Sequence, residues 1–77
     1  MKKVIKQIES ELRFLEKEDN ILNELIDMKL PEISIEKLFE MRNENCLKTI
    51  ELLKLCDKLD ILIKYNDNCE VELYKEN

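Results

Sequence analysis

The sequence predicts an all-α protein, built as an antiparallel helical hairpin or a small helical bundle. The chain has 77 residues with no glycine and a single proline, and charged residues make up 40% of it. Glycine supplies the left-handed backbone that tight β-turns need, so its absence disfavours hairpin-rich folds. Leucine, isoleucine, glutamate and lysine are abundant, and most of these favour helix. The length predicts one helical domain, residues 1–77, and chains this short are commonly stabilised by self-association.

The first helix is predicted at residues 3–29. Its apolar side chains follow a seven-residue repeat at Ile5, Ile8, Leu12, Leu15, Leu22 and Ile26. Asp19 stands where this repeat expects an apolar residue. One interpretation is a continuous helix with Asp19 as a solvated or register-setting position. The other is a break at residues 18–20, with Asn20 capping a new helix. We favour the continuous helix, because Asp and Asn are weak helix formers but not helix breakers.

The second helix is predicted at residues 34–65. Leu30-Pro31 ends the first helix, since a residue before proline avoids the α conformation, and Ser34 can cap the next helix. The most regular apolar face of the chain is Leu52, Leu55, Cys56, Leu59, Leu62 and Ile63. This face is rotated by about a third of a turn from the apolar face near residue 35, more than supercoiling absorbs. We therefore expect either a kink near Asn43 or contact with two different partners along the helix.

The last residues predict a short C-terminal tail or an edge strand. Asn66-Asp67-Asn68 is a turn-forming cluster, and apolar and polar residues then alternate over residues 69–74. A hairpin with residues 61–65 would require those residues to leave the helical pattern, which fits them better.

Composition excludes several classes of function. The net charge of −5 disfavours nucleic-acid binding, which depends on neutralising phosphates. The chain has no histidine and no glycine-rich loop, so we expect no catalytic residues, no metal and no cofactor. Three cysteines without a close pair indicate reduced thiols in a cytoplasmic setting. No apolar run approaches the ~20 residues of a membrane span.

Six residues are predicted to form a partner-binding surface. Glutamates recur every four residues in an acidic ridge, Glu32, Glu36, Glu40 and Glu44. The functional interpretation is a docking surface for a basic protein, and the alternative is a solvated helix face. Phe14 and Phe39 are candidate anchors, and Phe14 points away from the main apolar stripe of its helix.

Two segments resemble known families. Residues 55–60 followed by Leu62-Ile63-Lys64-Tyr65 resemble the second helix of the small sporulation-regulator hairpins, which bind a phosphorylated response regulator. Leu59 and Asp60 match that motif, while Cys56-Asp57-Lys58 replaces its Ser-Gln-Glu, and the connection from the first helix is longer. Residues 33–60 are similar to phage-repressor-type helix-turn-helix domains, but lack the usual glycines and would place glutamates against the phosphates.

These observations predict a small, non-enzymatic, cytoplasmic regulatory protein. We expect it to bind and inhibit another protein through a helical surface, and to form a homodimer. The alternatives are a helix-turn-helix transcriptional regulator that binds DNA, and a sporulation-type hairpin that binds a response regulator.

Overall fold

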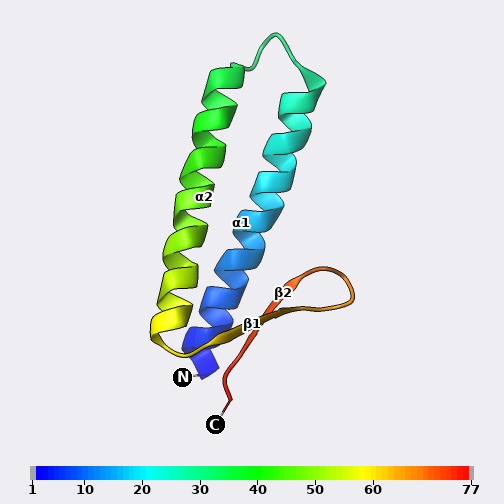
Figure 1. The fold of residues 1–77 in the computed structure, drawn as a ribbon. Coiled ribbons are helices and arrows are strands. Elements are labelled where there is room, and N and C mark those ends of the chain that lie inside the picture. Colours follow the sequence, from blue (N-terminus) through cyan, green and yellow to red (C-terminus); the bar gives the residue numbers. More distant parts are fainter. Residues whose placement is uncertain (1, 77) are drawn as a thin grey trace.

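The computed structural model describes residues 2–76 as two long antiparallel helices followed by a β-hairpin (Figure 1). The elements are α1 (Lys2–Met28), α2 (Ile35–Lys58), β1 (Leu62–Tyr65) and β2 (Val71–Tyr74). The molecule is elongated, with extents of 52 × 25 × 16 Å. The predicted helical hairpin is therefore confirmed, with a small antiparallel sheet added at one end. No described helix is long and apolar enough to span a bilayer.

Helix α1 is continuous, as predicted. It passes through Asp19 and Asn20 without interruption. The Asp19 Oδ1 atom lies 3.6 Å from Nε of Arg42 on α2, so the polar position in the repeat faces a basic residue of the neighbouring helix. The helix ends at Met28, and Lys29 follows with a positive φ of 52°.

Helix α2 begins at the predicted cap and has no break near Asn43. The Ser34 hydroxyl accepts a hydrogen bond from the Lys37 N–H at 3.3 Å. The helix then runs through residues 42–45 to Lys58, so the turn expected from the helix-turn-helix resemblance is not present.

The apparent rotation of the apolar face along α2 arises because two series of residues run side by side along this helix. The residues of α2 that face α1 alternate at spacings of three and four, and those in the middle are polar: Leu38, Arg42, Asn45, Thr49, Leu52 and Cys56. Beside them runs a second series, which we call the α2 apolar row: Phe39, Cys46, Ile50 and Leu53. The sequence pattern combined parts of both series into one face.

The predicted end of the second helix is wrong by seven residues. The helix stops at Lys58 because Asp60 adopts a left-handed conformation with φ 57°. Ile61 N–H then donates to the Cys56 carbonyl at 2.9 Å, and Asp60 N–H to the Asp57 carbonyl at 3.2 Å. This is the Schellman arrangement, which normally uses glycine at the left-handed position. Ile61 is buried, and the next four residues form β1 instead of helix.

Strands β1 and β2 pair antiparallel, with Leu62 opposite Tyr74 and Tyr65 opposite Val71. The strand-like signal at residues 69–74 is confirmed for residues 71–74, and the hairpin with residues 61–65 that we disfavoured is the one that forms, with β1 at Leu62–Tyr65. Asn66 organises the turn, because its side-chain oxygen accepts from the N–H groups of Asn68 and Glu70, each at 2.9 Å. Cys69 adopts φ 60°, the left-handed position that completes a three-residue hairpin loop.

The hydrophobic core lies at the hairpin end of the helix pair (Figure 1). It joins α1, α2, β2 and the residue before β1 through Ile8, Leu12, Cys56, Ile61, Val71 and Leu73. Cys56 is only 1% exposed, which confirms its predicted burial. Leu55, which the sequence placed on the same face, is exposed instead.

Candidate functional site

Two open grooves run along opposite flanks of the α1–α2 contact. The first, which we call the hairpin-side groove, lies between the helices and the β-hairpin, and its apolar lining is Leu12, Leu15, Cys46, Ile50, Leu53, Tyr65 and Val71. The second, the Phe14 groove, is lined by Glu11, Phe14, Leu15, Glu18, Lys48, Glu51, Leu52 and Leu55. The Phe14 groove is the more acidic of the two, because three carboxylates and one lysine line it, whereas two carboxylates and one arginine line the hairpin-side groove.

Phe14 is the most prominent feature of its groove. Its side chain is 60% exposed. Three carboxylates, those of Glu11, Glu18 and Glu51, share the lining with it, and Lys48 is the only basic residue among the described lining residues. An exposed aromatic ring among acidic groups suits a basic, partly apolar segment of another protein.

Phe39 lies on the other flank of α2. Its ring is 6.0 Å from the guanidinium carbon of Arg42, and helical spacing places it in the α2 apolar row with Cys46. Lys48 and Glu51, which flank the Phe14 groove, project from the opposite side of the same helix. The two predicted aromatic anchors therefore do not belong to one surface.

The acidic ridge is divided between a loop and a helix. Glu32 lies in the α1–α2 loop, whereas Glu36, Glu40 and Glu44 lie on α2, and all four are exposed. Within residues 2–76, none of the four forms a salt bridge. Glu44 lies one turn before Lys48, so it extends the acidic border of the Phe14 groove.

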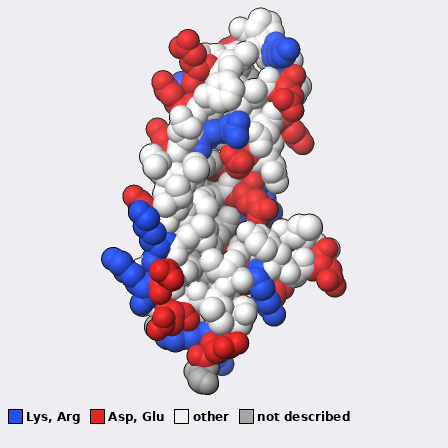
Figure 2. Space-filling view, in the orientation of Figure 1, with Lys and Arg blue, Asp and Glu red and all other residues white. Residues whose placement is uncertain are grey.

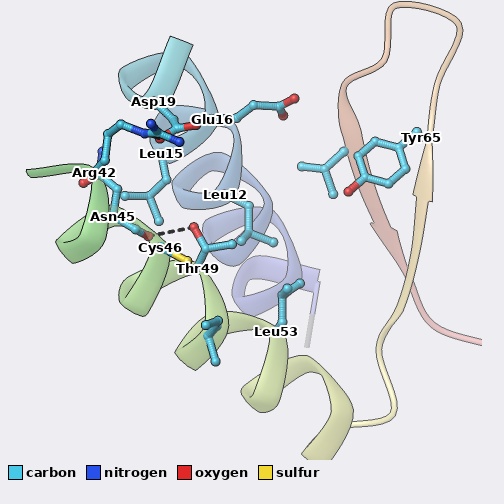
Figure 3. A pocket seen from close by; sticks show the side chains of 12 residues that line it. Leu12, Leu15, Glu16, Asp19, Arg42, Asn45, Cys46, Thr49, Leu53 and Tyr65 are labelled. Carbon is cyan, nitrogen blue, oxygen red and sulfur yellow. Dashed lines mark hydrogen bonds and ion pairs between the residues drawn. The ribbon is translucent and has the colours of Figure 1, made fainter. Parts of the chain in front are cut away.

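The hairpin-side groove is bounded by three elements (Figure 3). Helices α1 and α2 form its floor and one wall, and β1 contributes the Tyr65 ring, which is 68% exposed. In the space-filling view, charged side chains lie across the upper middle of this face, and uncharged surface continues below them between the helices and the hairpin (Figure 2). An apolar area bordered by charged groups is typical of a protein-binding surface.

A polar layer crosses the floor of the hairpin-side groove. We use this name for Asp19, Arg42, Asn45 and Thr49. Asn45 is only 7% exposed, and its Nδ2 group has no hydrogen-bond partner among the described residues. Thr49 Oγ1 donates to the Asn45 backbone carbonyl at 2.9 Å, so that interaction leaves the side-chain amide free. An unpaired buried donor costs ~1–3 kcal/mol, unless a ligand or a second chain supplies an acceptor.

Only one member of this layer, Asp19, was identified from the sequence, as a polar position within the apolar repeat of α1. Arg42, Asn45 and Thr49 also occupy core-facing positions, at the regular spacing of three and four residues along α2, so the signal was present. These three were missed because polar residues in a helix are ordinarily interpreted as solvent-exposed.

The β-hairpin is fixed to α1 by two side chains. Glu9 Oε2 accepts from the Leu73 N–H at 2.8 Å, and Arg13 Nε donates to the Val71 carbonyl at 2.9 Å. Glu9 and Arg13 also form an ion pair of 3.5 Å. These contacts set the position of the hairpin and therefore the width of the hairpin-side groove.

The cysteines and carboxylates of the described residues form no cluster of three that could hold a metal ion. Cys46, Cys56 and Cys69 are all free thiols. Burial raises the pKa of the Cys56 thiol, so this group stays neutral inside the core. The two grooves beside the α1–α2 contact are therefore candidate binding sites, and a third groove with a basic lining lies between the start of α1 and β2.

Comparisons of the chain with protein-family models, with curated proteins and with solved structures found no match.

Proposed function

We propose that this protein is a small non-catalytic regulator that binds another protein and inhibits it by covering part of its surface. The Phe14 groove is the docking site, and its ligand is a basic amphipathic helix of the partner. The observation that carries this proposal is the exposed Phe14 ring surrounded by three carboxylates.

Phe14 supplies the affinity in this proposal. Complete burial of a phenylalanine side chain contributes ~1.5–3 kcal/mol, and binding hot spots are commonly aromatic residues. A helix laid between α1 and α2 would cover the ring and also the exposed Leu55 at the other side of the groove. This is the helix-in-groove mode of recognition, in which apolar residues of one helix face fill the groove.

The carboxylates supply selectivity for a basic partner. Glu11, Glu18 and Glu51 border the groove, Glu44 lengthens this border, and the whole chain carries a net charge of −5. Such a field speeds association with a positively charged surface and weakens as salt is added. Glu36 and Glu40, further along α2, form a second acidic contact for a partner longer than the groove. The free thiols support the proposal of a cytoplasmic setting.

The test is capture of the partner from host lysate on immobilised protein, with identification by mass spectrometry. Wild type is compared with Phe14→Ala and with the control Phe39→Ala, which removes the same ring from the opposite flank. We expect Phe14→Ala to weaken the complex by at least about tenfold, as for a hot-spot residue, and Phe39→Ala to leave it intact. Equal capture by all three proteins would contradict the proposal.

The acidic ridge is tested separately with the double variant Glu36→Lys, Glu40→Lys. Helicity should be unchanged, because exposed helix charges contribute little to stability. Partner binding should weaken, and wild-type binding should fall with rising salt, since exposed charges are screened over ~8–10 Å. If binding resists both changes, the ridge is only a solvated face.

A further inference from the structure

The isolated chain exposes more surface than its mass requires. Its accessible area is 6303 Å² for a mass of 9.3 kDa. A compact monomer of this mass exposes about 5,000 Å². The excess of about 1,300 Å² exceeds the ~800 Å² that each partner contributes to a standard protein interface. The chain therefore has enough uncovered area for a stable contact with another macromolecule.

The hairpin-side groove contributes exposed apolar side chains to this uncovered surface. Ile50, Leu53 and Tyr65 are all exposed around it. Asp19 and Arg42, two of its charged lining residues, face each other at 3.6 Å, which leaves Glu16 as the remaining charged residue of the described lining. The Phe14 groove, by contrast, has four charged lining residues on α1 and α2. A ligand for the hairpin-side groove is thus selected by apolar contact and shape rather than by charge.

We propose that a second copy of this chain covers the hairpin-side groove, forming a symmetric homodimer. This goes beyond the proposed function, which uses the other groove. In the dimer the α2 apolar rows of the two copies pack against each other, and the four helices form a bundle. The β-hairpin of each copy, with Tyr65 at its groove side, lies against the helices of the other.

The exposed apolar residues of this face lie together on one side of α2. Three members of the α2 apolar row, Cys46, Ile50 and Leu53, line the groove, and all three are exposed. A twofold axis presents the same patch to itself, so these side chains of one copy meet the same side chains of the other. The excess exposed area of about 1,300 Å² is larger than the ~800 Å² that each partner contributes to such a contact.

In the homodimer, the second copy can supply a hydrogen-bond acceptor to the polar layer. The unpaired Asn45 Nδ2 lies at the groove floor, where the chain itself offers no acceptor among the described residues. A second copy brings carboxamide and carbonyl oxygens to the face. A buried asparagine at a core-facing position is a known means of fixing the register and number of chains in a helical assembly.

The test is sedimentation equilibrium of the full chain from the micromolar to the millimolar range. The dimer affinity of wild type is compared with that of two matched variants, Ile50→Glu and Leu55→Glu. Both residues are on α2 and similarly exposed, at 42% and 40%, but they lie on opposite flanks. We expect a wild-type dimer, weakened at least tenfold by Ile50→Glu and less than about threefold by Leu55→Glu. Circular dichroism checks that both variants remain helical, and Tyr65→Lys on β1 serves as the second probe of the same face.

Two measurements, the effect of salt and the capture of the partner protein, distinguish the homodimer from docking at the Phe14 groove. Two copies of net charge −5 repel, so adding salt should strengthen or preserve the dimer, whereas it should weaken docking to a basic partner. Ile50→Glu should leave partner capture through Phe14 intact. A wild-type monomer at every concentration, or equal weakening by Ile50→Glu and Leu55→Glu, would overturn the homodimer and leave the Phe14 proposal standing.

Discussion

Left-handed residues end three of the segments in a chain that has no glycine. Lys29 follows α1, Asp60 follows α2, and Cys69 closes the hairpin loop, with φ values of 52°, 57° and 60°. Each of these residues has a Cβ atom, and the left-handed conformation costs such residues about 1–2 kcal/mol. A backbone hydrogen bond holds each position, because the N–H groups of Lys29, Asp60 and Cys69 donate to carbonyl groups three residues earlier. Asp60 is also followed by the buried Ile61.

Asp60→Gly should stabilise the protein. Glycine relieves the left-handed strain, and the change also removes a negative charge next to the negative end of α2. The larger freedom of glycine in the unfolded chain offsets part of this, so the expected gain in the free energy of unfolding is about 0.5–1 kcal/mol. The control is Asp57→Gly, three residues earlier within α2, which should destabilise by about 1 kcal/mol. Urea denaturation of both variants checks the pair, and a destabilising Asp60→Gly would contradict the strain argument.

Cys56 predicts a pH dependence of stability. Burial raises the pKa of its thiol, so the folded state holds the proton more tightly than the unfolded state. This contribution to stability is complete below the ordinary cysteine pKa of about 8.5 and is lost as the pH rises towards the folded pKa. The free energy of unfolding of wild type should therefore fall as the pH rises above about 8.5. Cys56→Ala should lower stability at neutral pH but flatten this slope, whereas Cys46→Ala, at an exposed site, should keep it.

At the scale of elements, the β-hairpin depends on α1 for its position. Four-residue strands in a single pair are marginal in water, and this pair gains support from the core and from Glu9 and Arg13. These side chains satisfy backbone groups of β2 that another strand would otherwise take, which also protects the sheet from edge-to-edge association.

Glu9→Ala should loosen the hairpin without unfolding the helices. It removes the acceptor of the Leu73 N–H and the ion pair with Arg13, a loss of about 1–2 kcal/mol for a hydrogen bond to a charged group at a partly exposed site. The Leu73 amide should exchange with deuterium faster, as measured by NMR. Glu16→Ala, an exposed change on the same helix, is the control, and Glu9→Gln should retain part of the protection. Unchanged exchange at Leu73 in Glu9→Ala would contradict the tether.

The helices could be predicted from periodicity, but the end of α2 could not. The spacing of apolar residues alone predicted α1, and Pro31 and Ser34 predicted the position of the loop between the helices. The stop at Lys58 depends on Asp60 in a conformation that favours glycine, and no local signal distinguishes it. Residues 61–65 are an apolar run that suits a helix or a strand equally, and only pairing with β2 and packing on α1 decide between them.

At the scale of the whole molecule, one cluster joins both helices to the sheet. Leu12→Ala should therefore reduce the stability of every element together. Leu12 is buried in this cluster, so its truncation should cost about 2–5 kcal/mol, whereas Leu47→Ala at an exposed position of α2 should cost less than about 0.5 kcal/mol. Thermal unfolding followed by circular dichroism and by tyrosine fluorescence checks the prediction. Transitions of Leu12→Ala that separate helix from hairpin would show that the cluster does not couple them.

The candidate site was only partly accessible from sequence. Phe14 could be identified because it falls off the apolar stripe of α1, and the glutamates could be identified by their charge. Which of them belong together depends on the flank of α2 that each occupies, and this follows from the α1–α2 contact. Tyr65 joins the hairpin-side groove only because β1 folds back towards the helices, a change of direction that periodicity does not record.

The polar layer also divides the molecule into two parts of unequal strength. On its hairpin side lies the core cluster of both helices, Ile61 and β2, while on its loop side only Leu22 and Leu38 are buried among the described residues of the helices. The loop end is therefore where the helix pair should open first, while the hairpin end stays packed. A chain with this distribution of stability can part its two helices at one end while remaining folded at the other. Such local opening would let the same chain accept ligands of different thickness along its length.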